Sequence, residues 1–320
     1  MDNKILILLM SCNQALYKEE EQACMDTFLK DAEGAGIPFY FYKGVDSADK
    51  AFVDEEAHTM YINAPDILAG TSRKTIGAFI EALKIGGWDY VLKTNVSTWL
   101  DIEKIQKAVN TWEGRDDRNI YGARYLANDA SKNTPFPRGH FLMLSRSMVE
   151  GVVSVAPKLF NATGFPKTDD TLIGLSLLYH IHKNCGEKYL DHLMEVPSVV
   201  SWSDNIQEAQ DFSTALCIRC KCDSDQEKTP GNMLSAHKLK KNKKLKRSFR
   251  HPVEKVETRY GYITYGEFNQ LISLLKQKKE VTTENPSIST STGDIKRTGA
   301  KDAMLRIRER IDGLVPHDNQ

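Results

Sequence analysis

The pattern of apolar and polar positions along the chain is typical of an α/β protein. Short, nearly continuous apolar runs predict strands at residues 4–12, 37–44, 58–64, 88–96, 139–145 and 196–202. Continuous apolar runs indicate strands buried on both faces, as in a parallel sheet covered by helices. Helical spacing predicts helices between them, at residues 17–33, 72–84 and 172–182. The alternation predicts a doubly wound sheet.

The alternation of predicted strands and helices ends at about Pro230. We predict a core domain at residues 1–235, a basic segment followed by a helix at 236–280, and a Ser/Thr-rich flexible linker at 281–300. Residues 301–320 form a short tail in which apolar residues recur at helical spacing. The fold class is therefore α/β with a helical and basic C-terminal extension.

Composition excludes several classes of protein. The 320 residues include 43 Lys and Arg against 43 Asp and Glu, so the chain is not a globally basic nucleic-acid binder. No apolar run reaches the ~18 residues of a membrane span, and no signal-peptide pattern is recognisable. The six cysteines have no framework-like spacing, which favours a reducing compartment. We expect a cytoplasmic protein.

Residues 237–251 form a basic run without any acidic residue. Three interpretations remain open: a solvated loop, a contact with an anionic membrane surface, or nucleic-acid binding. Membrane contact would place the protein peripherally at the inner face of the membrane and would suit an acceptor carried on a lipid. Nucleic acid is disfavoured because only Phe249 interrupts the run as an aromatic residue.

Polar residues follow the predicted strand at 88–96, where α/β proteins bind ligands. They are Lys93, Thr94, Asn95 and Ser97, and a phosphate-bearing ligand would suit them. The alternative is an ordinary junction between a strand and a turn, since Asn and Ser favour turns.

Four short motifs, in order and spacing, resemble the inverting β-1,3-glycosyltransferases that include fringe and the β-1,3-galactosyltransferases. They lie at Asp66–Thr75, Tyr90–Trp99, Pro135–Arg146 and Asp169–Gly174. The resemblance covers about residues 4–205. It implies a GT-A-type, Rossmann-like mixed central sheet flanked by helices. It also implies an enzyme that transfers a sugar from a nucleotide sugar, with UDP favoured, to a glycan or lipid-linked glycan acceptor, as in polysaccharide synthesis.

The resemblance also implies roles for individual residues. Asp170 takes the position of the catalytic base, and the neighbouring charge of Asp169 would raise its proton affinity. Capping of the following helix by the two aspartates is an alternative compatible with catalysis. Gly139 and His140 are candidate acceptor contacts. The candidate donor contacts are Ser11, Lys74, Lys93, Thr94, Asn95 and Ser97, together with Arg219 and Lys221, which lie outside the resemblance and are candidates because of their charge and spacing.

The sequence departs from the family at the metal site. The family's Asp-x-Asp, which binds Mn²⁺ or Mg²⁺, is replaced by Asn95-Val96-Ser97. Neutral oxygens hold a hard cation less tightly than carboxylates do, so we expect a weak or vestigial metal site. Fixed cations would then stabilise the leaving group, and Arg219 and Lys221 would project from one side of a strand at residues 215–222. A solvated strand face is the alternative for these two residues.

Two further alternatives concern the whole chain and its cysteines. Loss of both metal-binding carboxylates is also what a catalytically inactive, binding-only relative would show, although the retained Asp169-Asp170 pair argues against this. Cys217, Cys220 and Cys222 form a C-x-x-C-x-C pattern. A structural zinc needs four ligands, and only His237 lies downstream nearby, so free thiols on a strand are the favoured interpretation.

Overall fold

The computed structural model confirms the predicted α/β architecture. It describes residues 4–45, 50–111, 116–123, 125–127, 135–163, 168–199, 215–221 and 226–241. The sheet and the candidate site lie in a compact unit made of residues 1–125 and 137–254. A second unit comprises residues 126–136 and 255–320, of which only residues 126–127 and 135–136 are described.

The central sheet has eight strands in the order β11-β7-β10-β5-β1-β2-β4-β3. These strands are β1 (Ile5–Met10), β2 (Phe39–Gly44), β3 (Phe52–Asp54), β4 (Thr59–Ile62), β5 (Tyr90–Asn95), β7 (Ile120–Gly122), β10 (Leu142–Ser145) and β11 (Leu193–Glu195). Most neighbours are parallel, but β10 runs antiparallel to both β5 and β7, and β3 antiparallel to β4. The sheet is therefore mixed, as expected of a GT-A-type fold.

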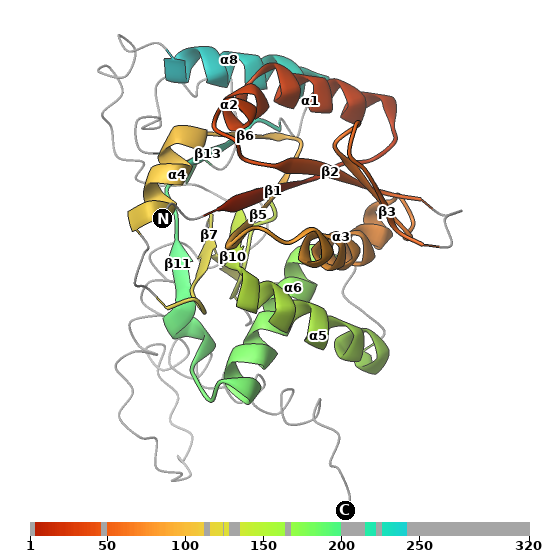
Figure 1. Ribbon diagram of the computed structural model, residues 1–320, viewed down its shortest axis with the longest axis vertical. Coiled ribbons are helices and arrows are strands. Elements are labelled where there is room, and N and C mark those ends of the chain that lie inside the picture. Colours follow the sequence, from red (N-terminus) through yellow and green to blue (C-terminus); the bar gives the residue numbers. More distant parts are fainter. Residues whose placement is uncertain are drawn as a thin grey trace, which may run out of the picture. The chain divides into compact units, whose positions relative to one another are not determined.

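Helices cover both faces of this sheet (Figure 1). One face carries α1 (Ala15–Asp26), α2 (Phe28–Gly34) and α8 (Thr229–Lys241), and the opposite face carries α3 (Thr71–Ile85), α5 (Arg146–Thr163) and α6 (Asp169–Tyr179). The remaining helix and helical turns are α4 (Ile102–Thr111), η1 (Leu68–Gly70), η2 (His180–Asn184), η3 (Tyr189–His192) and η4 (Gln226–Lys228).

The first strand shows why its sequence is apolar throughout. Ile7 and Leu9 belong to the core cluster shared with α1, α2 and α4, whereas Leu6 and Leu8 point to the other face. All four side chains are fully buried. Two covered faces leave no position for a polar residue until the strand ends at Ser11.

Smaller sheets complete the described fold. The strands β12 (Ser198–Val199), β13 (Cys217–Arg219) and β6 (Thr98–Leu100) form a three-stranded sheet, and β8 (Tyr125–Ala127) pairs with β9 (Pro135–Pro137). β6 follows β5 directly, and Arg219 pairs with Thr98 in the antiparallel register of β13 and β6. This register brings Arg219 beside the end of the central strand β5.

Several boundaries differ from the predicted ones. The helix predicted at 17–33 is two helices, because the chain breaks at Thr27, whose φ of −122° and ψ of −108° are not helical. The helix predicted at 172–182 starts earlier, at Asp169, and ends in the π-helical turn η2. The predicted end of α3 at Gly86 is confirmed, since Gly86 has a φ of 65°, which favours glycine.

The predicted C-terminal extension lies mostly outside the described residues. α8 crosses the predicted boundary at 235/236 and contains the first five residues of the basic run. Residues 242–320, which include the rest of that run, the predicted linker and the predicted tail helix, are not described, so those predictions stand as they were. Within the part of the chain that the structure covers, no helix is both long and apolar enough to cross a membrane.

Candidate active site

The candidate site lies at the edge of the sheet where β1 and β5 end. The parallel register of these strands places Met10 opposite Asn95, so Ser11 follows at the same edge. The antiparallel strand β10 begins here, because Leu142 pairs with Lys93. Strand direction thus brings together three segments that are distant in the sequence.

The two candidate catalytic carboxylates stand in the first turn of α6, after the N-cap residue Thr168. The N-cap position belongs to Thr168, so the prediction that the two aspartates cap the helix is wrong. A helix N-terminus nevertheless favours their negative charge, which is compatible with a catalytic role. The two side chains differ in access: that of Asp169 is 8% exposed and that of Asp170 is 25% exposed. Of the pair, Asp170 is the carboxylate that a ligand can reach.

Lys93 forms the centre of the site. Its Nζ lies 2.5 Å from Asp169 Oδ2 and 3.7 Å from Asp170 Oδ1, and it donates to the carbonyl oxygen of Gly139 at 3.2 Å. The side chain is only 1% exposed. Burial lowers the pKa of Lys93, but Asp169, Tyr42 and Asp170 together outweigh this, so the net pKa is raised. A contact between Lys93 and the donor sugar nucleotide stays a prediction. In this structure the ammonium forms ion pairs with the two aspartates.

Gly139 fixes Asp170 from the other side. Its backbone N–H donates to Asp170 Oδ2 at 2.9 Å. A Cβ placed on Gly139 would lie 2.6 Å from Asp170 Oδ1 and 3.0 Å from Lys93 Nζ. The close approach of backbone and carboxylate therefore requires glycine at this position.

The environment of Asp170 favours its protonated form. Burial is the largest cause that raises its pKa, followed by the charge of Asp169, while Lys93, the N–H of Gly139 and Arg219 act in the opposite direction. The net pKa is raised well above the ordinary 3.8 of an aspartate. A carboxylate with raised proton affinity and partial exposure is suited to accept a proton.

The polar residues at the end of β5 are largely engaged with the chain itself. Thr94 Oγ1 donates to the carbonyl oxygen of His140 at 2.7 Å. In the orientation that satisfies both ends of its amide, Asn95 donates to the carbonyl oxygens of Thr94 and Gly139 at 3.2 and 3.1 Å. The His140 side chain is buried, with 2% exposure, so its predicted acceptor contact would require it to move.

The residues at the family's metal position do not fit a tightly held divalent cation. Asn95 and Ser97 offer only neutral oxygens, and Ser97 is 8% exposed. Divalent hard cations in proteins are held chiefly by carboxylates. The nearest carboxylate pair, described above, already binds the ammonium of Lys93. We derive no chemical step through a metal here.

Ser11 and Lys74, two predicted donor contacts, meet at the end of β1. Lys74 Nζ donates to the Ser11 carbonyl oxygen at 3.0 Å and to Asp66 Oδ1 at 2.9 Å. The Ser11 hydroxyl donates to Glu21, which also binds Lys43 at 2.8 Å. The structure thus brings both residues to the predicted edge, but within a network of buried ion pairs.

Arg219 and Lys221 face different carboxylates. Arg219 acts electrostatically on Asp170, while Lys221 acts on Glu20 of α1. Arg219 is the last residue of β13, and Lys221 lies beyond it. Arg219 is therefore a cation near the candidate base Asp170, whereas Lys221 acts on the side near α1.

The structure is compatible with the interpretation of Cys217 and Cys220 as free thiols on or beside a strand. Cys217 and Cys220 are buried free thiols, and Cys222 lies outside the described residues. His237, the nearest downstream histidine, accepts a hydrogen bond at its Nδ1 from Trp99 Nε1 at 3.2 Å. No cluster of potential metal ligands among the described residues includes a cysteine.

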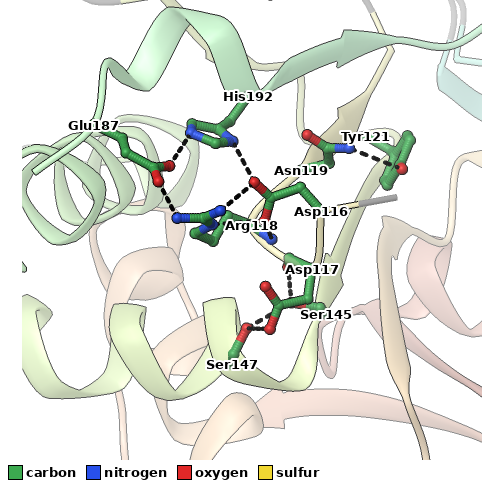
Figure 2. A network of polar contacts seen from close by, with 9 residues as sticks. All are labelled: Asp116, Asp117, Arg118, Asn119, Tyr121, Ser145, Ser147, Glu187 and His192. Carbon is green, nitrogen blue, oxygen red and sulfur yellow. Dashed lines mark hydrogen bonds and ion pairs between the residues drawn. The ribbon is translucent and has the colours of Figure 1, made fainter. Parts of the chain in front are cut away.

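A second polar cluster stands at the opposite edge of the sheet (Figure 2). Asp116 and Arg118 precede β7, and Glu187 and His192 precede the parallel strand β11. Arg118 binds Asp116 with Nε–Oδ1 at 2.6 Å and also pairs with Glu187, whose Oε2 lies 2.7 Å from His192 Nε2. Asp116, Glu187 and His192 could hold a metal, but the guanidinium already neutralises both carboxylates. This cluster ties two strand starts together.

Sequence reasoning missed Thr75, Tyr42 and Asp66 as parts of the site. Thr75 Oγ1 donates to Asp169 Oδ2 at 3.3 Å and lies 3.1 Å from the Tyr42 hydroxyl. Thr75 and Asp66 belong to the first of the four motifs, so the motif could have pointed to them. Tyr42 stands in an apolar strand and gave no signal.

Comparisons with known proteins give distant likenesses to solved structures only. No family model and no curated protein matches the sequence. Among solved structures, the chain is similar to the crystal structure of a glycosyltransferase involved in the glycosylation of the major capsid of PBCV-1. The TM-score is 0.43 and the identity 9%, over 72% of this chain and 99% of that chain. A likeness of this strength carries no argument about activity, and membership of the β-1,3 family stays a prediction.

Proposed function

We propose that the protein is an inverting glycosyltransferase with Asp170 as its catalytic base. The observation that carries the proposal is the Asp170 carboxylate itself. It is partly exposed at the carboxyl edge of the sheet, it stands at a helix N-terminus, and the N–H of Gly139 holds it at 2.9 Å. The raised pKa described above matches a group that must take a proton during the reaction.

The reaction is a single displacement. The oxygen of an acceptor hydroxyl bonds to the anomeric carbon of the donor sugar, and its proton goes to Asp170. The bond between that carbon and the diphosphate oxygen breaks, and the electron pair leaves with the nucleoside diphosphate. Asp169 lies against Lys93 at 2.5 Å and is 8% exposed, whereas Asp170 is 25% exposed, so a single accessible carboxylate of the pair suits a mechanism with a base and no second nucleophile.

Charge on the departing diphosphate is stabilised by the chain's own cations. Arg219 is a candidate because it acts electrostatically on Asp170, and Lys221 follows two residues later in the sequence. Backbone and side-chain donors at the ends of β1 and β5 complete the donor edge. The neutral pair Asn95 and Ser97 supports a transfer that does not depend on a tightly bound Mn²⁺ or Mg²⁺.

The finer assignment follows the sequence resemblance: a UDP-sugar donor, a β-1,3 linkage, and a glycan acceptor, lipid-linked where the basic run 237–251 contacts an anionic membrane. Of that run, the structure describes the part within α8. An inactive, binding-only role is less well supported because the candidate base is held in a specific geometry.

The test is turnover of a panel of nucleotide sugars by the purified chain, with Mn²⁺ and after chelation. We expect selective turnover that survives chelation and falls at least 100-fold in Asp170→Asn, in line with the typical contribution of general base catalysis. Asp191→Asn, an exposed aspartate, is the control and should keep wild-type activity. Failure of every nucleotide sugar to bind, or full activity in Asp170→Asn, would overturn the proposal.

A further inference from the structure

The candidate base belongs to a buried polar chain that reaches across four elements of the fold. The Tyr42 hydroxyl on β2 lies 3.1 Å from Thr75 Oγ1 on α3, and Thr75 donates to Asp169 Oδ2 at 3.3 Å. The same Oδ2 atom lies 2.5 Å from Lys93 Nζ on β5. Asp169 is thus held by two donors, while its neighbour Asp170 keeps an open side toward solvent.

The ammonium of Lys93 makes the connection to the reacting carboxylate. It lies between Asp169 and the loop that carries Gly139, and its distance to Asp170 Oδ1 is 3.7 Å. At this distance, in a buried site, the two charges interact strongly without a direct hydrogen bond. Asp170 is therefore fixed by the Gly139 N–H at one oxygen and faces a cation at the other.

We propose that Lys93 and Asp169 are positioning residues for Asp170, and that their ion pair both orients the Asp170 carboxylate and sets the pH range in which it accepts a proton. This inference rests on the proposed function of Asp170 as a base. Neither residue of the pair needs to touch the substrate. Lys93 attracts Asp170 and counters the repulsion from Asp169, so the two charges of the pair oppose each other at the reacting group.

The charged and titratable groups that face Asp170 come from several elements. They are Asp169 on α6, Lys93 on β5, Arg219 on β13 and the phenol of Tyr42 on β2. Burial raises the pKa of Tyr42, so this phenol stays neutral over the working range of an enzyme. Arg219 is always charged. The charges of Lys93 and Asp169 therefore determine how readily Asp170 accepts a proton.

The experiment removes each charge separately and follows the acid limb of the pH profile of kcat/KM. Lys93→Met removes a cation, so we expect the limb to move to higher pH by about one unit or more. Asp169→Asn removes an anion and leaves Lys93 to Asp170 alone, so the limb should move to lower pH. A purely structural role would reduce the rate in both variants without moving the limb in opposite directions.

Two measures protect the test against misfolding and against failure of the proposed function. The double variant Lys93→Met/Asp169→Asn removes both charges of the pair together, and its limb should return toward that of the wild type. The exposed pair Lys30 and Asp26 gives the controls Lys30→Met and Asp26→Asn, which should change neither rate nor profile. The Asp170 carboxyl is also titrated by ¹³C NMR without any substrate.

The outcomes separate cleanly. Opposite displacements in both NMR and kinetics support the inference. Absence of opposite displacements in the NMR titration would overturn it, whatever the turnover. Opposite displacements in NMR with no turnover in the wild type would overturn the proposed function and, with it, the assignment of the pair as positioning residues for catalysis.

Discussion

Lys74 Nζ lies 2.9 Å from Asp66 Oδ1, and this ion pair ties the segment between β4 and η1 to the start of α3. Lys74 is 3% exposed, and Asp66 also accepts backbone N–H groups from Asn13 at 2.7 Å and Gly44 at 3.0 Å. Burial raises the pKa of Asp66, but these donors outweigh it, and the net pKa is lowered. Asp66 thus joins three segments behind the donor edge.

Loss of this ion pair should destabilise the fold. We expect Lys74→Met to lower the free energy of unfolding by about 3 kcal/mol, because it leaves a partly buried carboxylate without its cation. Urea denaturation measures the change. The exposed pair of Lys30 and Asp26 serves for comparison, and Lys30→Met should change the free energy by less than about 1 kcal/mol. Equal effects of the two variants would contradict the structural role of Lys74.

Glu20 should make the stability of the protein depend on pH. It is buried on α1, and burial raises its pKa from 4.5 to about 7, which the charge of Lys221 only partly offsets. A raised carboxyl pKa means that its contribution to stability is complete below pH 4.5 and is lost as the pH rises through 7. We therefore expect Glu20→Gln to be more stable than the wild type at pH 8, with a smaller difference at pH 5.

Thermal unfolding at the two pH values measures this effect. Glu19→Gln, the exposed neighbour on the same helix, should leave the pH dependence unchanged. If the wild type and Glu20→Gln lose stability in parallel as the pH rises, Glu20 is not the group responsible.

The sequence predicted the central strands of the fold better than it predicted the contacts within the site. The apolar runs around Leu8 and Val91 correctly predicted central strands, because burial on both faces leaves a continuous signal. The strands β3 and β6 were not predicted, since three residues are too few to show a period. The break at Thr27 was also missed, because the helical spacing continues across it.

In the site, sequence motifs named Lys93, Gly139 and Asp170, but not how they are joined. Lys93 and Gly139 are 46 residues apart, and Gly139 and Asp170 are 31 apart. Only the antiparallel insertion of β10 beside β5 brings them together. The sequence therefore predicted donor binding for Lys93, whereas its neighbours in the fold are carboxylates.

Arg219 should contribute to donor affinity. A hydrogen bond from a guanidinium to a diphosphate is worth about 1.5 to 3 kcal/mol, so Arg219→Ala should weaken UDP binding about tenfold or more. Lys221→Ala should have a smaller effect because Lys221 faces Glu20. Isothermal titration calorimetry gives the affinities, with the exposed Arg73→Ala as the reference. Unchanged affinity in both variants would remove them from the donor site.

Carboxylates placed at positions 95 and 97 should create a site that binds a divalent cation. In the double variant Asn95→Asp/Ser97→Asp, two carboxylate oxygens replace neutral ones, and we expect measurable Mn²⁺ binding by electron paramagnetic resonance where the wild type shows little or none. The single variants should bind more weakly than the double variant. Wild-type binding as tight as that of the double variant would contradict our interpretation of Asn95 and Ser97.

Arg118 should determine whether the second cluster takes up a metal. In Arg118→Met, Asp116, Glu187 and His192 lose their internal cation, and their ligand atoms lie within 4.8 Å of one another. We expect this variant to melt at a lower temperature than the wild type and to regain stability on addition of Zn²⁺. Arg146→Met, which removes an exposed pair with Glu150, should not respond to zinc. Zinc stabilisation of the wild type would show that Arg118 does not exclude the metal.

The reversed direction of β10 places the start of this strand at the same edge of the sheet as the ends of β1 and β5. The chain leaves the sheet after β7 and returns at the start of β10, and the N–H of Ala123 donates to the carbonyl oxygen of Phe141 at 3.1 Å. Both ends of residues 124–140 are therefore anchored to each other, and doubling such a loop costs only about 0.6 kcal/mol in closure entropy. Insertions there would reshape the surroundings of Gly139 while the register of β5 and β1 stays the same. The length of the chain before β10 and the register of the parallel strands can therefore vary independently of each other at this edge of the sheet.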